Sequence, residues 1–213
     1  MPTRSEQRAA VLFIHGLWMN GLAMLYLVHA LRKGGFAAEY FNYRSMTGTL
    51  SEHVTALCDR VAGIAADKVH IVAHSFGGIV ALHFLKGAQD HRLGRLVLLG
   101  TPVGGSQAAR TLAQWPAGKL MLGRSVDVWR SDPPVPPAPK SCIGAIAGSR
   151  AMGLGAICMN VPKPCDGVVT VDETRLPGLA DHLVLPVSHS GMLISREVAR
   201  QTAVFLRTGS FQR

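Results

Sequence analysis

One stretch of the sequence, KVHIVAHSFGGIVALHFL at residues 68–85, joins an apolar strand to an apolar helix through a single serine. Residues 68–74 favour a buried strand, because the run is mostly apolar. Ser75 follows directly, between the small residues Ala73 and Gly77. Backbone strain in so tight a corner tends to persist where it serves a function. The stretch therefore predicts a strand, a turn and a helix in succession, and it makes Ser75 a candidate for chemistry.

Strands and helices alternate along the first half of the chain. Apolar runs predict strands at residues 9–15, 37–43, 68–74 and 94–100. Helical periodicity predicts helices at residues 20–33, from a cap at Thr47 or Ser51 to Ile64, and at 76–88. This alternation predicts an α/β fold with a mostly parallel central sheet and helices on both faces. Ligands of such sheets bind beyond the carboxyl ends of the strands.

The second half of the chain is less regular. Residues 101–140 contain a predicted helix at 106–114 and the run DPPVPPAP, whose five prolines do not suit a helix interior or a central strand. We interpret 101–140 as an irregular segment that flanks or covers the site, as a lid or part of a substrate groove. Regular structure is predicted to resume at residues 142–148, 166–174 and 181–189, with a last helix at about 191–206. The 213 residues fit one domain, 1–213.

Composition narrows the class of protein. Hydrophobic residues make up 48% of the chain and charged residues 16%, which is typical of a globular protein. No apolar run reaches the ~18 residues of a membrane span, and the first residues lack a signal-peptide pattern, so we expect a cytoplasmic protein. The net charge is +9, but the basic residues are scattered. That distribution argues against a nucleic-acid partner and allows weak association with anionic lipid surfaces.

The cysteines do not indicate a metal site. Cys58, Cys142, Cys158 and Cys165 show neither a CxxC pair nor Cys/His ligand spacing, so we expect no metal. Free thiols are expected in a chain without an export signal. Pairing of Cys158 with Cys165 stays open.

Ser75 lies in a near match to the nucleophile elbow G-x-S-x-G, with Ala73 in place of the first glycine. An elbow of this kind exposes the serine oxygen at a helix N-terminus, where free N–H groups stabilise negative charge. One donor would be the N–H of Phe76, and the second the N–H of Leu17, or that of Trp18, after the first strand. The alternative is a glycine-rich turn without chemistry.

A serine hydroxyl needs a base, and nine histidines compete for that role. His189 lies in the loop PVSHSGML, between a predicted strand end and the last helix, where a base is needed. Asp166 precedes it, and the order Ser75, Asp166, His189 is that of one hydrolase class. His15 is interpreted as a structural histidine that shapes its loop. Other carboxylates that could orient His189 are Asp127, Asp132, Asp172, Glu173 and Asp181.

Several apolar residues are candidates for the substrate site. Gly16 lets the backbone approach a substrate closely, and Trp18 and Met19 follow it. Five apolar residues further along could line an acyl groove or pack in the core: Trp115, Leu120, Met121, Leu122 and Trp129.

Five segments, FIHG, AHSFGG, LGTPVGGS, DGVV and SHSGM, occur in an order that resembles the α/β-hydrolase family, and within it the small bacterial serine esterases and lipases. The resemblance covers most of the chain. It implies a Ser-Asp-His triad, no cofactor, and hydrolysis of an ester through an acyl-enzyme. We expect carboxylic esters with short to medium acyl chains, lipids included. A thioesterase, an amidase or an acyltransferase on the same triad remains an alternative, as does a binding module without catalysis.

Overall fold

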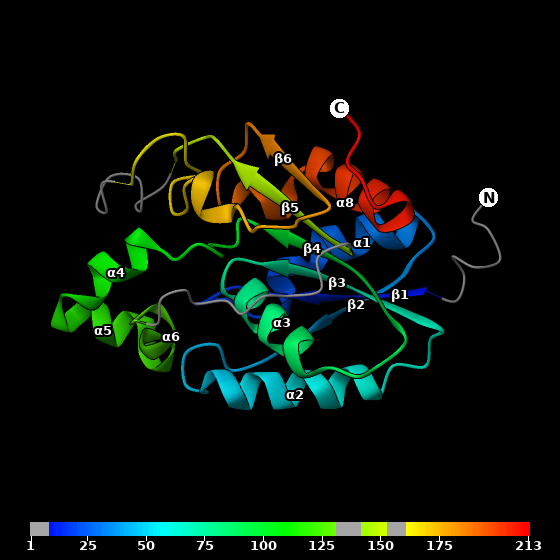
Figure 1. Cartoon of the computed structure of the whole chain (residues 1–213), viewed down its shortest axis with the longest axis horizontal. Coiled ribbons are helices and arrows are strands. Elements are labelled where there is room, and N and C mark those ends of the chain that lie inside the picture. Colours follow the sequence, from blue (N-terminus) through cyan, green and yellow to red (C-terminus); the bar gives the residue numbers. More distant parts are fainter. Residues whose placement is uncertain (1–8, 131–141, 153–160) are drawn as a thin grey trace.

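A computed structural model describes residues 9–130, 142–152 and 161–213. In this part of the chain the centre is a six-stranded sheet with the order β2-β1-β3-β4-β5-β6 (Figure 1). Every neighbouring pair of strands runs parallel. The strands are β1 (Ala9–Ile14), β2 (Ala37–Phe41), β3 (Lys68–His74), β4 (Leu93–Leu99), β5 (Ile143–Gly148) and β6 (Asp181–Leu185). The predicted α/β fold with a parallel sheet is confirmed.

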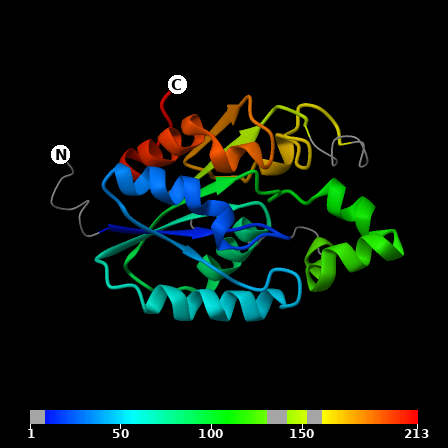
Figure 2. The same cartoon turned by 180° about the vertical axis from the view of Figure 1, so that it is seen from behind.

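Helices cover both faces of the sheet. The helices α1 (Leu25–Lys33) and α8 (Arg196–Thr208) lie on one face, and α2 (Leu50–Ala62) and α3 (Phe76–Gly87) lie on the other (Figures 1 and 2). Successive residues of β1 alternate between the two cores: Leu12 packs on the α2–α3 side and Phe13 on the α1–α8 side. A strand buried on both faces favours an unbroken apolar sequence, which is why β1 was recognisable from sequence.

The cap of α2 was predicted at the wrong residue. Thr49, rather than Thr47 or Ser51, caps this helix. The hydroxyl of Thr49 accepts from the N–H of Glu52 at 3.2 Å, and the Glu52 carboxylate accepts from the N–H of Thr49 at 2.6 Å. This reciprocal capping box requires a Glu or Gln three residues after the cap. Of the three candidates, Thr49 has that spacing.

Other element boundaries differ from the predictions as well. The first helix begins as a 3-10 turn, η2 (Gly21–Met24), and the last is preceded by η6 (Gly191–Ile194). Residues 166–174 form no strand. Thr170 forms an isolated bridge with Cys165, and residues Asp172–Thr174 form a 3-10 turn, η5, because Glu173 accepts from the N–H of Thr170 and turns the chain.

Residues 101–130 hold more helix than the sequence indicated. They form α4 (Gln107–Ala113), α5 (Pro116–Leu122), the 3-10 turn η3 (Gly123–Ser125) and α6 (Val126–Arg130). Proline is favourable at the first position of α5, because an N–H at this position would have no partner within the helix. We call α4, α5 and α6 the cap helices. They lie beyond the carboxyl ends of the strands (Figure 1). The run DPPVPPAP lies outside the described residues.

Three further observations concern the described residues. None of their helices combines the length and the apolar character needed to cross a membrane. They contain no group of three or more His, Cys, Asp or Glu side chains placed to hold a metal ion. Cys165 is buried, with its thiol 3.9 Å from the carbonyl oxygen of Val161. Cys165 has a free thiol, so the structure does not pair it with Cys158, which lies outside the described residues.

Candidate active site

Ser75 connects β3 to α3 in a strained conformation. Its φ is 53° and its ψ is −125°, in a region that residues other than glycine rarely adopt. The corner is held by two backbone hydrogen bonds. The N–H of Ser75 donates to the carbonyl of Leu99 at 2.9 Å, and the N–H of Gly78 donates to the carbonyl of Ser75 at 2.9 Å. The serine is thus fixed at the carboxyl edge of the sheet, between β3 and β4.

The corner depends on glycine because the backbone is packed on all sides. A Cβ atom on Gly77 would lie 2.4 Å from the carbonyl oxygen of His15, and one on Gly78 would lie 2.1 Å from the hydroxyl of Thr101. A Cβ atom on Gly16 would lie 3.1 Å from that of Ser75. Ala73 lies inside β3 and is fully buried. An alanine is therefore accommodated at the position where the usual motif has its first glycine.

Three side chains form one line of hydrogen bonds. The hydroxyl of Ser75 lies 3.0 Å from Nε2 of His189, and Nδ1 of His189 lies 2.7 Å from Oδ2 of Asp166. The other carboxylate oxygen of Asp166 accepts from the N–H groups of Val168 at 2.9 Å and Val169 at 2.7 Å. These bonds leave Nδ1 of His189 as the donor to the carboxylate and Nε2 as the acceptor from the serine.

The other candidate carboxylates face elsewhere. Asp172 is exposed and pairs with Arg175 at 3.4 Å. Glu173 accepts from the N–H of Gln107 at 2.6 Å. Asp181 accepts from the N–H of Phe211 at 2.8 Å, Asp127 is exposed on α6, and Asp132 lies outside the described residues. Among the described carboxylates, the structure brings Asp166 to His189.

Two residues at strand ends, Gly100 and His74, belong to the site although the sequence analysis assigned them no role in it. Gly100 follows β4 with φ +54°, and a Cβ atom there would lie 3.0 Å from Oδ2 of Asp166 and 3.1 Å from Nδ1 of His189. His74, the last residue of β3, is fully buried, with its Nε2 3.1 Å from the carbonyl oxygen of His189. A glycine directly after a strand is the one signal that could have indicated Gly100. Nothing local indicates the contact of His74, because its partner is 115 residues away.

The loop after β1 is held by His15 and Tyr43. Nδ1 of His15 lies 2.9 Å from the carbonyl oxygen of Gly16, and the hydroxyl of Tyr43 donates to the carbonyl of His15 at 2.9 Å. The two rings stack with centroids 4.4 Å apart. Burial lowers the pKa of His15 and favours the neutral ring. His15 therefore shapes the loop that carries Leu17.

Trp18 joins that loop to the cap helices. Its φ is 60°, which makes it, with Ser75, one of two described non-glycine residues with positive φ. The indole N–H of Trp18 donates to the carbonyl of Met121 at 2.5 Å. Met121 is the penultimate residue of α5. The side chain is 53% exposed. The cap is thus attached to the loop that precedes the serine in sequence and faces it in space.

A cavity of about 300 Å³ opens onto Ser75 and His189. The predicted substrate residues Gly16, Trp18 and Met19 line it, together with Leu17 and Phe76. The cap helices contribute further lining residues, all apolar: Ala108, Ala109, Leu112, Met121, Leu122 and, in α6, Trp129. Of the five uncertain apolar residues, Met121, Leu122 and Trp129 therefore line the cavity. Trp115 and Leu120 do not line it and are 61% and 81% exposed.

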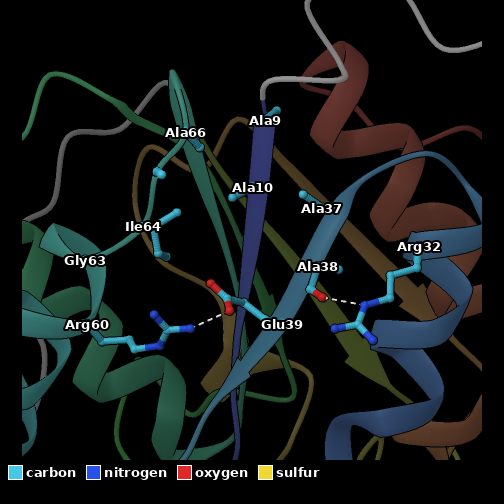
Figure 3. Close-up of a pocket in the computed structure, with 11 residues that line it drawn as sticks. Ala9, Ala10, Arg32, Ala37, Ala38, Glu39, Arg60, Gly63, Ile64 and Ala66 are labelled. Atoms are coloured by element: carbon cyan, nitrogen blue, oxygen red, sulfur yellow. Dashed lines mark hydrogen bonds and ion pairs between the residues drawn. The ribbon is translucent and has the colours of Figure 1, made fainter.

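A larger cavity of about 490 Å³ lies at the amino ends of β1 and β2 (Figure 3). Its polar contacts are an ion pair between Arg60 and Glu39 and a hydrogen bond of 2.6 Å from Arg32 to the carbonyl of Ala38. Its described lining contains no serine, cysteine or histidine. Size therefore does not identify the site here, and the smaller cavity is the candidate active site.

Solved structures with the same fold include a bacterial lipase, a metagenomic carboxyl esterase and a pyrethroid hydrolase. A lipase of Bacillus licheniformis, BlEst2 in its mature form, matches with a TM-score of 0.73 and 21% identity over 97% of this chain and 93% of that one. The metagenomic carboxyl esterase MGS0156 matches with a TM-score of 0.66 and 15% identity over 96% and 76%. The pyrethroid hydrolase PytH matches with a TM-score of 0.66 and 12% identity over 94% and 98%. These likenesses establish the fold.

Sequence comparison establishes the family. Comparison with curated proteins gives no match. The profile described as "Alpha/beta hydrolase family" matches residues 11–155, which run from β1 to beyond β5 and include the corner at Ser75. With the parallel sheet and this match over more than half of its length, the chain belongs to the α/β-hydrolase family.

Proposed function

We propose that this protein is a serine esterase that cleaves carboxylic esters with apolar acyl chains of short to medium length. One observation carries the proposal: the hydrogen-bonded line Ser75, His189, Asp166 ends at an apolar cavity. A serine becomes a nucleophile when a base accepts its proton, and the base is effective when a third group orients it. All three requirements have a matching side chain in this site.

In the first half of the reaction, Nε2 of His189 accepts the proton of Ser75 while the serine oxygen bonds to the ester carbonyl carbon. The carbonyl oxygen becomes an oxyanion, for which the N–H groups of Leu17 and Phe76 are the assigned donors. Asp166 holds the imidazole in the required tautomer and stabilises the imidazolium.

The oxyanion then collapses and the bond to the alcohol breaks. His189 gives its proton to the leaving alcohol oxygen, and the acyl group stays on Ser75. In the second half, His189 accepts a proton from a water molecule as the water oxygen attacks the acyl carbon. Collapse releases the carboxylic acid and returns the proton to Ser75. No cofactor takes part in this sequence.

The cavity supports an apolar acyl group. None of its described lining residues carries a fixed charge, and the cap supplies alanine, leucine, methionine and tryptophan side chains. Burial of apolar substrate surface against such a lining is favourable. Two of the structural neighbours, a lipase and a carboxyl esterase, support the same bond type. The net charge of +9 would add weak attraction to anionic lipid surfaces.

Hydrolysis of p-nitrophenyl esters, from acetate to palmitate, tests the proposal. We expect turnover by the wild type and loss of turnover in Ser75→Ala, because no other group would form the acyl-enzyme. Ser51→Ala is the control, since Ser51 is exposed on α2. The chain length with the highest kcat/KM reports the size of the cavity.

Turnover that survives in Ser75→Ala would contradict the triad. A wild type that cleaves thioesters or amides but not esters would move the function to the alternative acyl bonds. A folded wild type that is inactive on all of them would favour the binding module.

A further inference from the structure

His74 is a buried histidine that contacts the proposed base without belonging to the triad. It is fully buried at the end of β3, and its Nε2 lies 3.1 Å from the backbone carbonyl oxygen of His189. A carbonyl oxygen can only accept, so Nε2 of His74 must carry the hydrogen. The rings of the two histidines lie 4.6 Å apart between centroids at 49°. His74 therefore contacts both the backbone and the ring of His189.

The second nitrogen of His74 has no partner among the described residues. Nδ1 is buried without a hydrogen bond, and a Cβ atom on Gly16 would lie 3.0 Å from it. A doubly protonated ring would bury a second N–H there without an acceptor, which is unfavourable. Burial together with the neighbouring His189 lowers the pKa of His74 to about 3. The ring is consequently neutral, with its one hydrogen on Nε2.

The loop that carries His189 has two polar anchors near the ring. The N–H of His189 donates to the carbonyl of Asp166 at 2.9 Å, and the carbonyl of His189 accepts from His74. The first anchor fixes His189 relative to the carboxylate. The second fixes it relative to β3, and β3 runs directly into Ser75. Loss of the second anchor would therefore let the ring of His189 shift relative to Ser75 and to Asp166 alike.

We propose that His74 is a positioning residue that registers His189 against Ser75, and that it does so as a neutral donor. This role rests on the proposed esterase function. Neutrality matters because His189 becomes a cation when it accepts the serine proton. A charge on the adjacent ring would oppose that step, whereas a neutral ring leaves it unopposed. A hydrogen bond that acts on geometry affects the chemical step more than substrate binding.

Three variants separate the donor from the ring. His74→Phe keeps a ring and removes the donor. His74→Gln keeps an N–H donor at about the reach of Nε2. His74→Asn keeps a donor that is too short to reach the carbonyl of His189. The matched control is His70→Phe in the same strand, where a buried ring accepts from the N–H of Arg95 at 2.8 Å, at the far end of β3 from the site.

We expect kcat of His74→Phe and His74→Asn to fall by roughly 10-fold or more with little change in KM, since a misplacement of about 1 Å can cost about 100-fold. His74→Gln is expected to recover most of the lost kcat. His70→Phe is expected to lower the melting temperature and to leave kcat unchanged. Wild-type kcat in His74→Phe, or failure of His74→Gln to recover it in a folded protein, would overturn the inference.

A second readout does not depend on turnover. The hydrogen on Nδ1 of His189, bonded to Asp166, should give a downfield proton resonance in NMR spectra. We expect it in the wild type, in His74→Gln and in His70→Phe, and we expect it broadened or lost in His74→Asn and His74→Phe. An unchanged resonance in both of those variants would overturn the inference even if the protein cleaves no ester. A wild type that cleaves no ester would instead overturn the proposed function and would leave this readout available.

Discussion

The corner around Ser75 and the cap helices face each other across one cavity, and they are built differently. The corner packs tightly around the half-buried Ser75: a Cβ atom on Gly77 or Gly78 would clash with the backbone of His15 or the side chain of Thr101, and one on Gly100 would crowd Asp166 and His189. The cap is made of short helices with exposed apolar side chains, including Trp115 at 61% and Leu120 at 81%. Chemistry requires fixed geometry, whereas substrate fit tolerates variation. We therefore propose that the corner carries the reaction chemistry and that the cap selects the length of the acyl chain.

The largest loss of activity is expected for Asp166→Asn, which changes the chemistry of the site and keeps the size of the side chain. The amide would keep an acceptor for the N–H groups of Val168 and Val169 and would turn its NH₂ group toward His189. That favours the wrong tautomer of the imidazole, and we expect kcat to fall by about 10⁴-fold. Steady-state kinetics on p-nitrophenyl butyrate measures it. Asp172→Asn, an exposed neighbour, should keep wild-type kcat, and equal kcat in both variants would contradict the role of Asp166.

Crowding of the same corner gives the next largest effect. Gly100→Ala places a methyl group 3.0 Å from Asp166 and 3.1 Å from His189, at φ +54°. We expect a loss of about 1–2 kcal/mol in the free energy of unfolding from the backbone conformation, with a lower kcat because the pair is displaced. Denaturant unfolding and kinetics measure the two losses.

Gly87→Ala is its matched control. A Cβ atom on Gly87 has no neighbour within 4 Å, and the residue ends α3. Alanine should leave activity unchanged and should not lower stability. A Gly100→Ala variant that behaves like this control would show that the corner is less tightly built than described.

The cap is tested by reducing the cavity. Ala109→Leu adds bulk on α4 where the residue lines the cavity. We expect kcat/KM for octanoate esters to fall by roughly 10-fold or more relative to acetate, because about one methylene changes discrimination by ~10-fold or more. Ala117→Leu makes the same substitution at an exposed position of α5 outside the lining. An unchanged ratio in Ala109→Leu would remove chain-length selection from the cap.

The smallest expected effect concerns the bond between the two regions. Trp18→Phe keeps an apolar ring and removes the donor to the carbonyl of Met121. One hydrogen bond of this kind contributes about 1 kcal/mol, so we expect kcat/KM for butyrate to fall about 5-fold. Trp115→Phe, in the exposed part of the cap, should leave it unchanged. Identical values for both variants would indicate that the cap and the loop after β1 act independently.

Much of the fold was predictable because its signals are local. The strand β1 is a continuous apolar run, β3 and β4 are mostly apolar, and Ser75 follows β3 in a cramped motif. The order of Ser75, Asp166 and His189 in the sequence also selected the three residues that the structure brings together. Each of these conclusions depended on composition within a few neighbouring residues or on chain order.

The rest required contacts that sequence spacing does not contain. The cap helices are short, and their apolar residues are divided among the core, the cavity and the exposed surface, so their periodicity is weak. Thr49 was missed although its capping box is local, because Thr47 and Ser51 are equally good cap residues when Glu52 is ignored. Gly100 and His74 acquire their roles from residues 66 and 115 positions away (166 − 100 and 189 − 74).

Asp166 accepts two hydrogen bonds from His189: its carboxylate lies 2.7 Å from Nδ1 of the ring, and its backbone carbonyl lies 2.9 Å from the backbone nitrogen. These two hydrogen bonds close the chain segment between Asp166 and His189 into a loop. Its turn at Pro177 and Gly178 is exposed. Lengthening a closed loop costs little, about 0.6 kcal/mol for each doubling. We therefore expect the turn to accept an inserted sequence or a fused module, while the two hydrogen bonds of Asp166 hold His189 in place.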